Sequence, residues 1–232
     1  MPEIFTLSLA SDSNLQGYWR LENDYTDSSV NGYTLTASGG PSFVAGNFGQ
    51  AVDLEETSSQ YASRAAASVP NLRITTSQTW GCWVKPESAN ASRNCAMGVL
   101  DAAAANTYVV LKHQGVVGGD APTFEIFGLT PALVTADSAL TIGTWQLLVG
   151  RYNSSDNTLA IFINTTKKSI AVTGSISFNG NEGFSIGAVG LFIAQFADGI
   201  IDDAFIFNRA LTDLEIESIF EAVGGGIPFI GY

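Results

Sequence analysis

The sequence has 232 residues, 46% hydrophobic and 14% charged, which excludes a disordered chain and suffices for one large all-β domain. Lys and Arg total 10 against 22 Asp and Glu, which gives a formal net charge of −12. This charge repels phosphate backbones and anionic lipid headgroups, so we expect no nucleic-acid partner and no membrane insertion, whereas divalent cations and neutral sugars are compatible with it.

Residues 1–16 are predicted to form an N-terminal arm. Secretory signals need a basic start followed by an apolar run, but the first Lys or Arg is Arg20, and Ile4 to Ala10 is only weakly apolar. No stretch approaches the ~18 uninterrupted apolar residues of a membrane span. We therefore expect no signal peptide, and a protein that works outside the cell would leave it by another route.

The middle of the chain has the pattern of a β-sandwich or barrel. Short β-rich runs alternate with clusters of Gly, Asn, Asp, Ser and Pro at intervals of about ten residues. Predicted strands include Thr79 to Pro86, Trp145 to Tyr152 and Thr158 to Ile163. Asn153 to Asn157, between the last two, is predicted to be a hairpin loop.

Two cysteines provide almost no disulfide framework for a chain of this size. Cys82 lies in a predicted strand and Cys95 opens the next one, so a hairpin could bring them together, but the sequence does not fix the register. We favour two free, partly buried thiols over a disulfide. A zinc site needs four ligands, and His113 is the only histidine.

Near the C-terminus, an acidic strand leads into a capped helix. The strand is predicted to end at Phe207, and a helix from Asp213 to Val223 begins after Thr212, with Glu215 three residues later as in a capping box. The neighbouring carboxylates Asp202 and Asp203 must point to opposite sides of a regular strand. We expect Asp202 to share a face with Ala204 and Ile206, where a buried carboxylate needs a partner.

Residues 224–232 form a glycine hinge and an apolar tail. Three glycines precede an apolar tip that would be a poor free tail in water. We therefore expect the tip to dock on its own domain or on another subunit, and we expect a homo-oligomer. The predicted assembly contacts are Ile227, Phe229, Ile230 and Tyr232.

Six short stretches follow one another in an informative order. They are Gly17 to Glu22, Asp27 to Gly32, Gly46 to Val52, Trp80 to Pro86, Trp145 to Tyr152 and Phe162 to Asn164. Closed by the strand and helix of Gly199 to Ile216, this series resembles the laminin-G-like, concanavalin A-like jelly rolls. No single stretch is specific for that family, but the ordered series covers residues 17–223.

The resemblance implies an all-β fold, a two-sheet antiparallel jelly-roll sandwich with one short C-terminal helix, over residues 17–223. Many members of the family carry a structural calcium ion between the N-terminal turn and the last strand. For this chain the resemblance implies calcium held by Asp202, Asp27 and Asn31, with backbone carbonyls among the ligands. The metal-free alternative is that Asp202 accepts hydrogen bonds from turn amides.

The sequence offers little for catalysis, and we expect no catalytic residues. Related sandwich glycosidases place two carboxylates on one strand, but no Glu-x-Asp-x-x-Glu pattern occurs here. Asp53 and Glu55 share a strand face and could imitate such a pair, although a solvated edge is the favoured interpretation. His113 lacks a Gly-x-Ser-x-Gly partner and is predicted to be a loop or surface residue.

These observations favour a non-catalytic binding or structural module. The leading hypothesis is an extracellular subunit of a virion or cell-surface assembly with glycan adhesion. The alternative is a carbohydrate-binding lectin module of a secreted or surface protein, and a glycoside hydrolase is less favoured. Aromatic residues that could stack on sugars, or equally pack inside the sandwich, are Tyr33, Tyr61, Tyr108 and Phe124.

Overall fold

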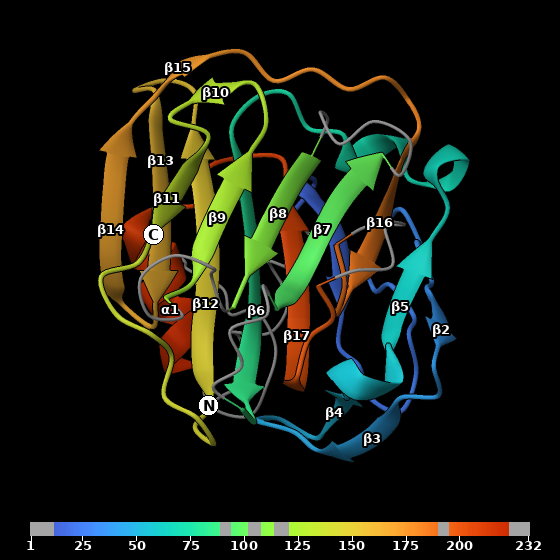
Figure 1. Ribbon diagram of the computed structural model, residues 1–232. Coiled ribbons are helices and arrows are strands. Elements are labelled where there is room, and N and C mark those ends of the chain that lie inside the picture. Colours follow the sequence, from blue (N-terminus) through green and yellow to red (C-terminus); the bar gives the residue numbers. More distant parts are fainter. Residues whose placement is uncertain (1–11, 89–93, 102–107, 114–120, 190–194, 223–232) are drawn as a thin grey trace.

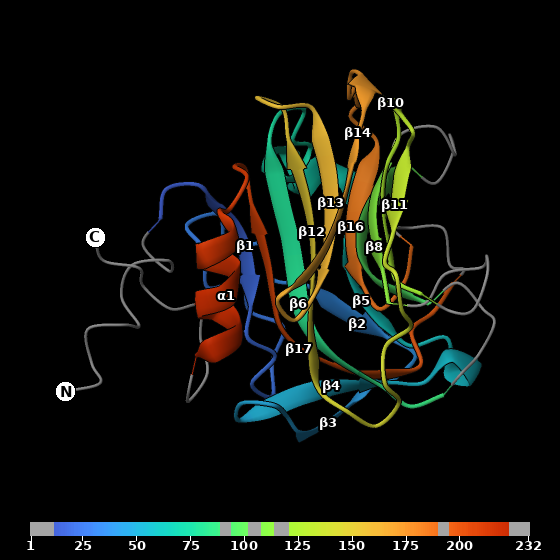
Figure 2. The same cartoon turned by 90° about the vertical axis from the view of Figure 1, so that its left-hand side faces the viewer.

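The computed structural model describes residues 12–88, 94–101, 108–113, 121–189 and 195–222. Two antiparallel β-sheets pack face to face, and one α-helix lies on the outer side of one of them (Figure 1 and Figure 2). This is the predicted jelly-roll sandwich with one short C-terminal helix. The predicted C-terminal assembly contacts lie outside the described residues.

The first sheet, which we call sheet A, carries the helix. One of its edge strands, β14, presents lysines, and the centre is occupied by β6 and β17. Its strands in spatial order are β14 (Thr166–Ala171), β13 (Thr158–Ile163), β12 (Gln146–Asn153), β6 (Gln78–Pro86), β17 (Gly199–Phe207), β4 (Gln50–Leu54) and β3 (Ser42–Ala45), with β1 (Leu15–Trp19) also paired to β17.

The second sheet, sheet B, covers the opposite side of the core. Its strands in order are β11 (Leu133–Thr135), β9 (Thr123–Ile126), β8 (Tyr108–Lys112), β7 (Cys95–Asp101), β16 (Glu182–Ile186), β5 (Tyr61–Arg64) and β2 (Thr36–Ser38). A small ribbon and three 3₁₀ helices complete the fold: β10 (Leu129–Thr130), β15 (Thr173–Gly174), Glu56–Ser58, Ala66–Ser68 and Pro70–Leu72.

The core lies between the sheets because each strand turns alternate apolar residues inward. Trp19 of sheet A stacks on Phe184 of sheet B with ring centroids 4.5 Å apart, so one aromatic pair joins the two layers. The predicted strands are confirmed: β13 has the predicted limits, β6 begins one residue earlier than predicted, and β12 is shifted by one residue toward the C-terminus. The turn between β12 and β13 falls within the predicted loop.

Helix α1 (Asp213–Glu221) confirms the predicted capping box. The Thr212 side chain accepts a hydrogen bond from the Glu215 amide, and the Glu215 carboxylate accepts one from the Thr212 amide. Ile216 and Ile219 are buried against the outer face of sheet A. The helix ends at Glu221, before the predicted limit.

Replacing Thr212 with Ala is expected to lower the free energy of unfolding by about 1 kcal/mol, because the Glu215 amide would lose its acceptor. Urea denaturation of the variant measures the loss. Thr212→Ser keeps the hydroxyl and is the matched control, so it should stay close to the wild type. Equal stability of the Ala variant would show that the cap contributes little.

Strand β17 is not regular where its two acidic residues lie. One edge pairs with β6, whereas the other pairs first with β4 and then with β1, and the register shifts between Asp202 and Phe205. Asp203 has a φ of 45°, as in a bulge. Ile201 therefore joins Ala204 in the main core, and the predicted face for Asp202 is wrong because the bulge breaks the alternation.

The two cysteines lie in different sheets, Cys82 on β6 and Cys95 on β7. Both are free thiols, as predicted, but they are fully rather than partly buried. The suggested hairpin between them is wrong, because the chain crosses from sheet A to sheet B after Pro86. The described part of the chain contains no helix with the length and apolar character that a membrane crossing requires.

Candidate functional site

The buried carboxylate of Asp202 lies where β4 and β1 meet end to end along β17. Asp202 is fully buried, and its Oδ2 accepts a hydrogen bond of 3.0 Å from the amide of Phe48, in the turn between β3 and β4. Gly46 opens this turn, and a Cβ at that position would stand 2.6 Å from Asp202 Oδ2. The turn can approach the carboxylate only because Gly46 has no side chain.

A second carboxylate binds the same turn. Glu22, shortly after β1, accepts a hydrogen bond of 2.9 Å at Oε2 from the amide of Gln50. Gly49 has a φ of 56°, and a Cβ there would overlap the Glu22 carboxylate. Arg20 is 3.6 Å from Glu22, at a position half open to solvent. The turn of residues 46–50 therefore holds two carboxylates through its amides.

The environment of Asp202 disfavours a free negative charge. Burial raises the pKa of Asp202 to about 7; the negative charges of Asp203 and Glu22 add to the rise, and the backbone amides of Phe48 and Asp203 oppose it. Its other oxygen, Oδ1, has no hydrogen-bond partner among the described residues. A buried, unpartnered carboxylate oxygen beside a second carboxylate is a donor set that suits a divalent cation such as calcium.

Asp27 and Asn31 belong to a different hydrogen-bond network. Asp27 Oδ1 accepts from the amides of Tyr18 and Ser29, and Oδ2 accepts from the Tyr33 amide and the Ser29 hydroxyl. Asn31 donates to the Gln16 carbonyl at 2.9 Å. The turn of residues 46–50 thus connects Asp202 to Glu22, and not to Asp27 or Asn31. Both carboxylate oxygens of Asp27 already accept hydrogen bonds from protein groups.

Asp203, on the bulge, has a protein partner. The Tyr18 hydroxyl donates a hydrogen bond of 2.7 Å to Asp203 Oδ1. Burial raises the pKa of Tyr18, and the charge of Asp203 raises it further, so Tyr18 stays protonated as the donor. Of the two neighbouring aspartates, Asp202 is the one with a fully buried oxygen that has no partner among the described residues.

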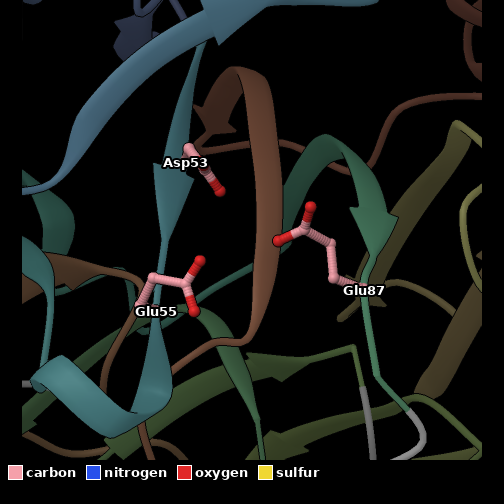
Figure 3. Close-up of side chains that lie close together, drawn as sticks. All are labelled: Asp53, Glu55 and Glu87. Carbon is pink, nitrogen blue, oxygen red and sulfur yellow. The ribbon is translucent and has the colours of Figure 1, made fainter.

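Three other carboxylates gather at the end of sheet A where β17 begins. Figure 3 shows Asp53 of β4, Glu55 directly after it and Glu87 directly after β6, with their side chains directed toward one another. Their ligand-type oxygens lie within 4.8 Å of one another. Burial raises the pKa of Glu87, with smaller increases from Asp53 and Glu55. Asp53 is half-buried and the other two are exposed, so the group is an acidic surface cluster, close to the predicted solvated edge.

His113 is not the predicted surface residue. It follows β8 and is fully buried, and neither ring nitrogen has a hydrogen-bond partner among the described residues. Burial lowers its pKa to about 4, against a smaller opposing effect of Asp198. A neutral, enclosed imidazole of this kind is not positioned to activate a nucleophile.

A protein-family model described as the concanavalin A-like lectin/glucanases superfamily matches residues 56–217. The chain belongs to this superfamily. A comparison with curated protein sequences gave no match.

Several solved structures share this superfamily fold at low sequence identity. Domain 4 of AbnA, an extracellular arabinanase of Geobacillus stearothermophilus in complex with arabinotriose, is 19% identical with a TM-score of 0.69, covering 88% of this chain and 97% of that one. The binding domain of Paraclostridial Mosquitocidal Protein 1 is 16% identical with a TM-score of 0.67, covering 92% of this chain and 52% of that one.

A third similar structure is the CBM40 domain of the Ruminococcus gnavus IT-sialidase bound to α2,3-sialyllactose. It is 10% identical with a TM-score of 0.59, and the match covers 80% of this chain and 97% of that one. At these identities the three likenesses establish the fold of the superfamily domain and no more.

Of the four aromatic residues named as sugar-stacking candidates, two are closed to ligand. Tyr33 and Phe124 are buried in the core of the superfamily sandwich. Tyr61 and Tyr108 lie on the outer side of sheet B, where Tyr61 contacts Phe196 and Tyr108 contacts Phe127. Both are half-buried, so a sugar could reach only part of either ring.

Sequence reasoning missed Glu22, the Phe48 amide and Glu87. The stretches that contain Glu22 and Phe48 were both recognised as superfamily landmarks, but nothing local indicated that they meet at Asp202. The available signal was the pair Gly46 and Gly49 in a five-residue stretch, since closely spaced glycines often mark a close approach of the backbone to another group.

Proposed function

We propose that this superfamily domain is a non-catalytic glycan-binding module. The observation that carries the proposal is that the sandwich matches, over nearly the whole of both chains, a domain solved with a bound oligosaccharide. A second domain of this fold was solved with sialyllactose. The net charge of −12 and the predicted extracellular location are compatible with this function.

One observation favours a glycoside hydrolase as a second candidate. Asp53, Glu55 and Glu87 bring carboxylate oxygens within 4.8 Å of one another, and retaining glycosidases use two carboxyl groups about 5 Å apart. The sequence lacks the Glu-x-Asp-x-x-Glu strand of the related sandwich glycosidases. We therefore rank the binding module first.

On an array of neutral and acidic glycans, the full chain is expected to bind a subset of oligosaccharides and to leave them intact. Calorimetry on the strongest binder measures its affinity, and chromatography of the mixture after overnight incubation detects any new reducing ends. Binding without cleavage supports the module, whereas cleavage that Glu87→Gln abolishes would establish the hydrolase. No binding to any glycan would overturn the proposed function.

We also propose that calcium binds at Asp202, with Glu22 and carbonyl groups of residues 46–50 as further ligands. The unpartnered Oδ1 of Asp202 supports this assignment, and calcium takes six to eight oxygens, often including backbone carbonyls. The ion would neutralise Asp202 and tie β17 to β1 and to the turn before β4. Its role is structural.

The role in a virion or cell-surface assembly stays a prediction of the sequence. It depends on Ile227, Phe229, Ile230 and Tyr232, which lie outside the described residues. Native mass spectrometry of the full chain tests the predicted homo-oligomer.

A further inference from the structure

A polar groove opens at one rim of the sandwich, where three segments far apart in the sequence meet. Its volume is about 310 Å³, at the lower end of the range for ligand sites. Gln16 of β1, Asn71 of the Pro70–Leu72 helix and Asn208 after β17 line it, together with Thr75 and Thr76. Side-chain amides and hydroxyls thus dominate the wall.

A chain of amide hydrogen bonds fixes one side of the groove. Asn71 Nδ2 donates to Asn31 Oδ1 at 2.7 Å, and Asn31 Nδ2 donates to the Gln16 carbonyl. The backbone amide of Asn71 also donates a hydrogen bond to the hydroxyl oxygen of the buried Tyr33. Asn31, predicted as a metal ligand, is therefore the link that positions Asn71, and Asn71 Oδ1 stays available as an acceptor.

The groove carries no uncompensated charge. Arg73, in the same wall, forms an ion pair of 2.9 Å with the fully buried Glu182 and donates to the carbonyls of Gly180 and Glu182. Among the described residues that line the groove, none is a carboxylate or a second cation. A charged ligand would find no free counter-charge here.

Three other lining residues offer hydrogen-bonding groups that the described part of the protein does not use. Thr75, Thr76 and Asn208 are exposed, and their side chains form no hydrogen bond to another described residue. Each hydroxyl and amide can both donate and accept. Ring hydroxyls of a neutral sugar have the same dual character, so an uncharged wall of mixed donors and acceptors fits them.

We propose that this groove is a binding subsite for a neutral saccharide unit, held by Thr75, Thr76, Asn71 and Asn208. The inference rests on the proposed glycan-binding function and adds its location and the class of ligand. Sugars carrying carboxylate or sulfate groups at this position are expected to be rejected, because desolvating such a group without a counter-charge is unfavourable.

The test compares two double variants of the full chain, each of which replaces a pair of adjacent threonines. Thr75→Ala/Thr76→Ala removes two groove hydroxyls, whereas Thr165→Ala/Thr166→Ala removes two exposed hydroxyls at the β13–β14 turn. The probe is the neutral oligosaccharide that binds the wild type most strongly on the array, titrated by calorimetry. We expect the groove variant to bind about tenfold more weakly than the wild type, a loss of about 1.4 kcal/mol. The control variant should bind as tightly as the wild type.

Four outcomes decide the matter. Selective loss in the groove pair, repeated in Asn208→Ala, supports the subsite. Equal affinity of both pairs for a neutral glycan overturns the subsite and leaves the proposed function intact. Binding that requires an acidic group on the glycan overturns the ligand class. Failure of the wild type to bind any glycan overturns the proposed function and the subsite together.

Discussion

Removing calcium with a chelator is expected to lower the melting temperature of the wild-type chain at pH 7.5. A ligand that binds only the folded state at a hundred times its dissociation constant adds about 2.7 kcal/mol to stability. The loss should be large because Asp202 would then be left buried beside Glu22 and Asp203 with one oxygen unpartnered. Differential scanning calorimetry with and without EDTA measures it.

Three variants identify the ligand. Asp202→Asn keeps an acceptor for the Phe48 amide but removes the charge, so it should abolish the response to calcium without unfolding the apo chain. Glu217→Gln, on the exposed face of α1, should respond like the wild type. Asp27→Ala should be destabilised equally with and without calcium, because it orphans three backbone amides. A calcium response that survives Asp202→Asn would contradict the assignment.

Acidification from pH 6.5 to 4 is expected to lower the free energy of unfolding through His113. Its pKa is about 4 in the folded chain and about 6.5 when unfolded. Above pH 6.5 both states are neutral. As the pH falls, the unfolded chain binds a proton that the folded chain resists, so about 3 kcal/mol is lost by pH 4.

The control isolates this residue from the carboxylates. In the metal-free chain the raised pKa of Asp202 has the opposite effect: it lowers the free energy of unfolding as the pH rises from about 3.8 to 7. Urea titrations at a series of pH values, with calcium present, give the free energy of unfolding of the wild type and of His113→Leu. The contribution of Asp202 is common to both proteins and cancels in the difference. His113 is the only histidine, so parallel pH profiles for the two proteins would refute the expectation.

Elements whose signals are local were predictable from the sequence. The capping box at Thr212 and Glu215 depends on residues three apart, and strand β13 is bounded by a turn on each side. The ordered landmarks were sufficient for the superfamily. In each case the decisive contacts lie within the segment, so no tertiary information was needed.

The candidate site depended on contacts that no segment encodes alone. The face of Asp202 follows from a bulge forced where β17 changes partner from β4 to β1, which is a property of the whole sheet. Glu22 meets Asp202 only through the turn of residues 46–50. His113 follows a strand at a position that looked like a loop, and its burial results from tertiary packing.

The separate burial of the two cysteines has a consequence for the chemistry of the fold in reducing and oxidising surroundings. Cys82 packs in the main core between the sheets, whereas Cys95 packs in a separate cluster with Leu100, Val110 and Val189, so the two thiols point into different parts of the molecule. Burial also raises the pKa of both thiols, which leaves little reactive thiolate. The described fold is therefore held together without a disulfide, and its two thiols are shielded from thiol exchange.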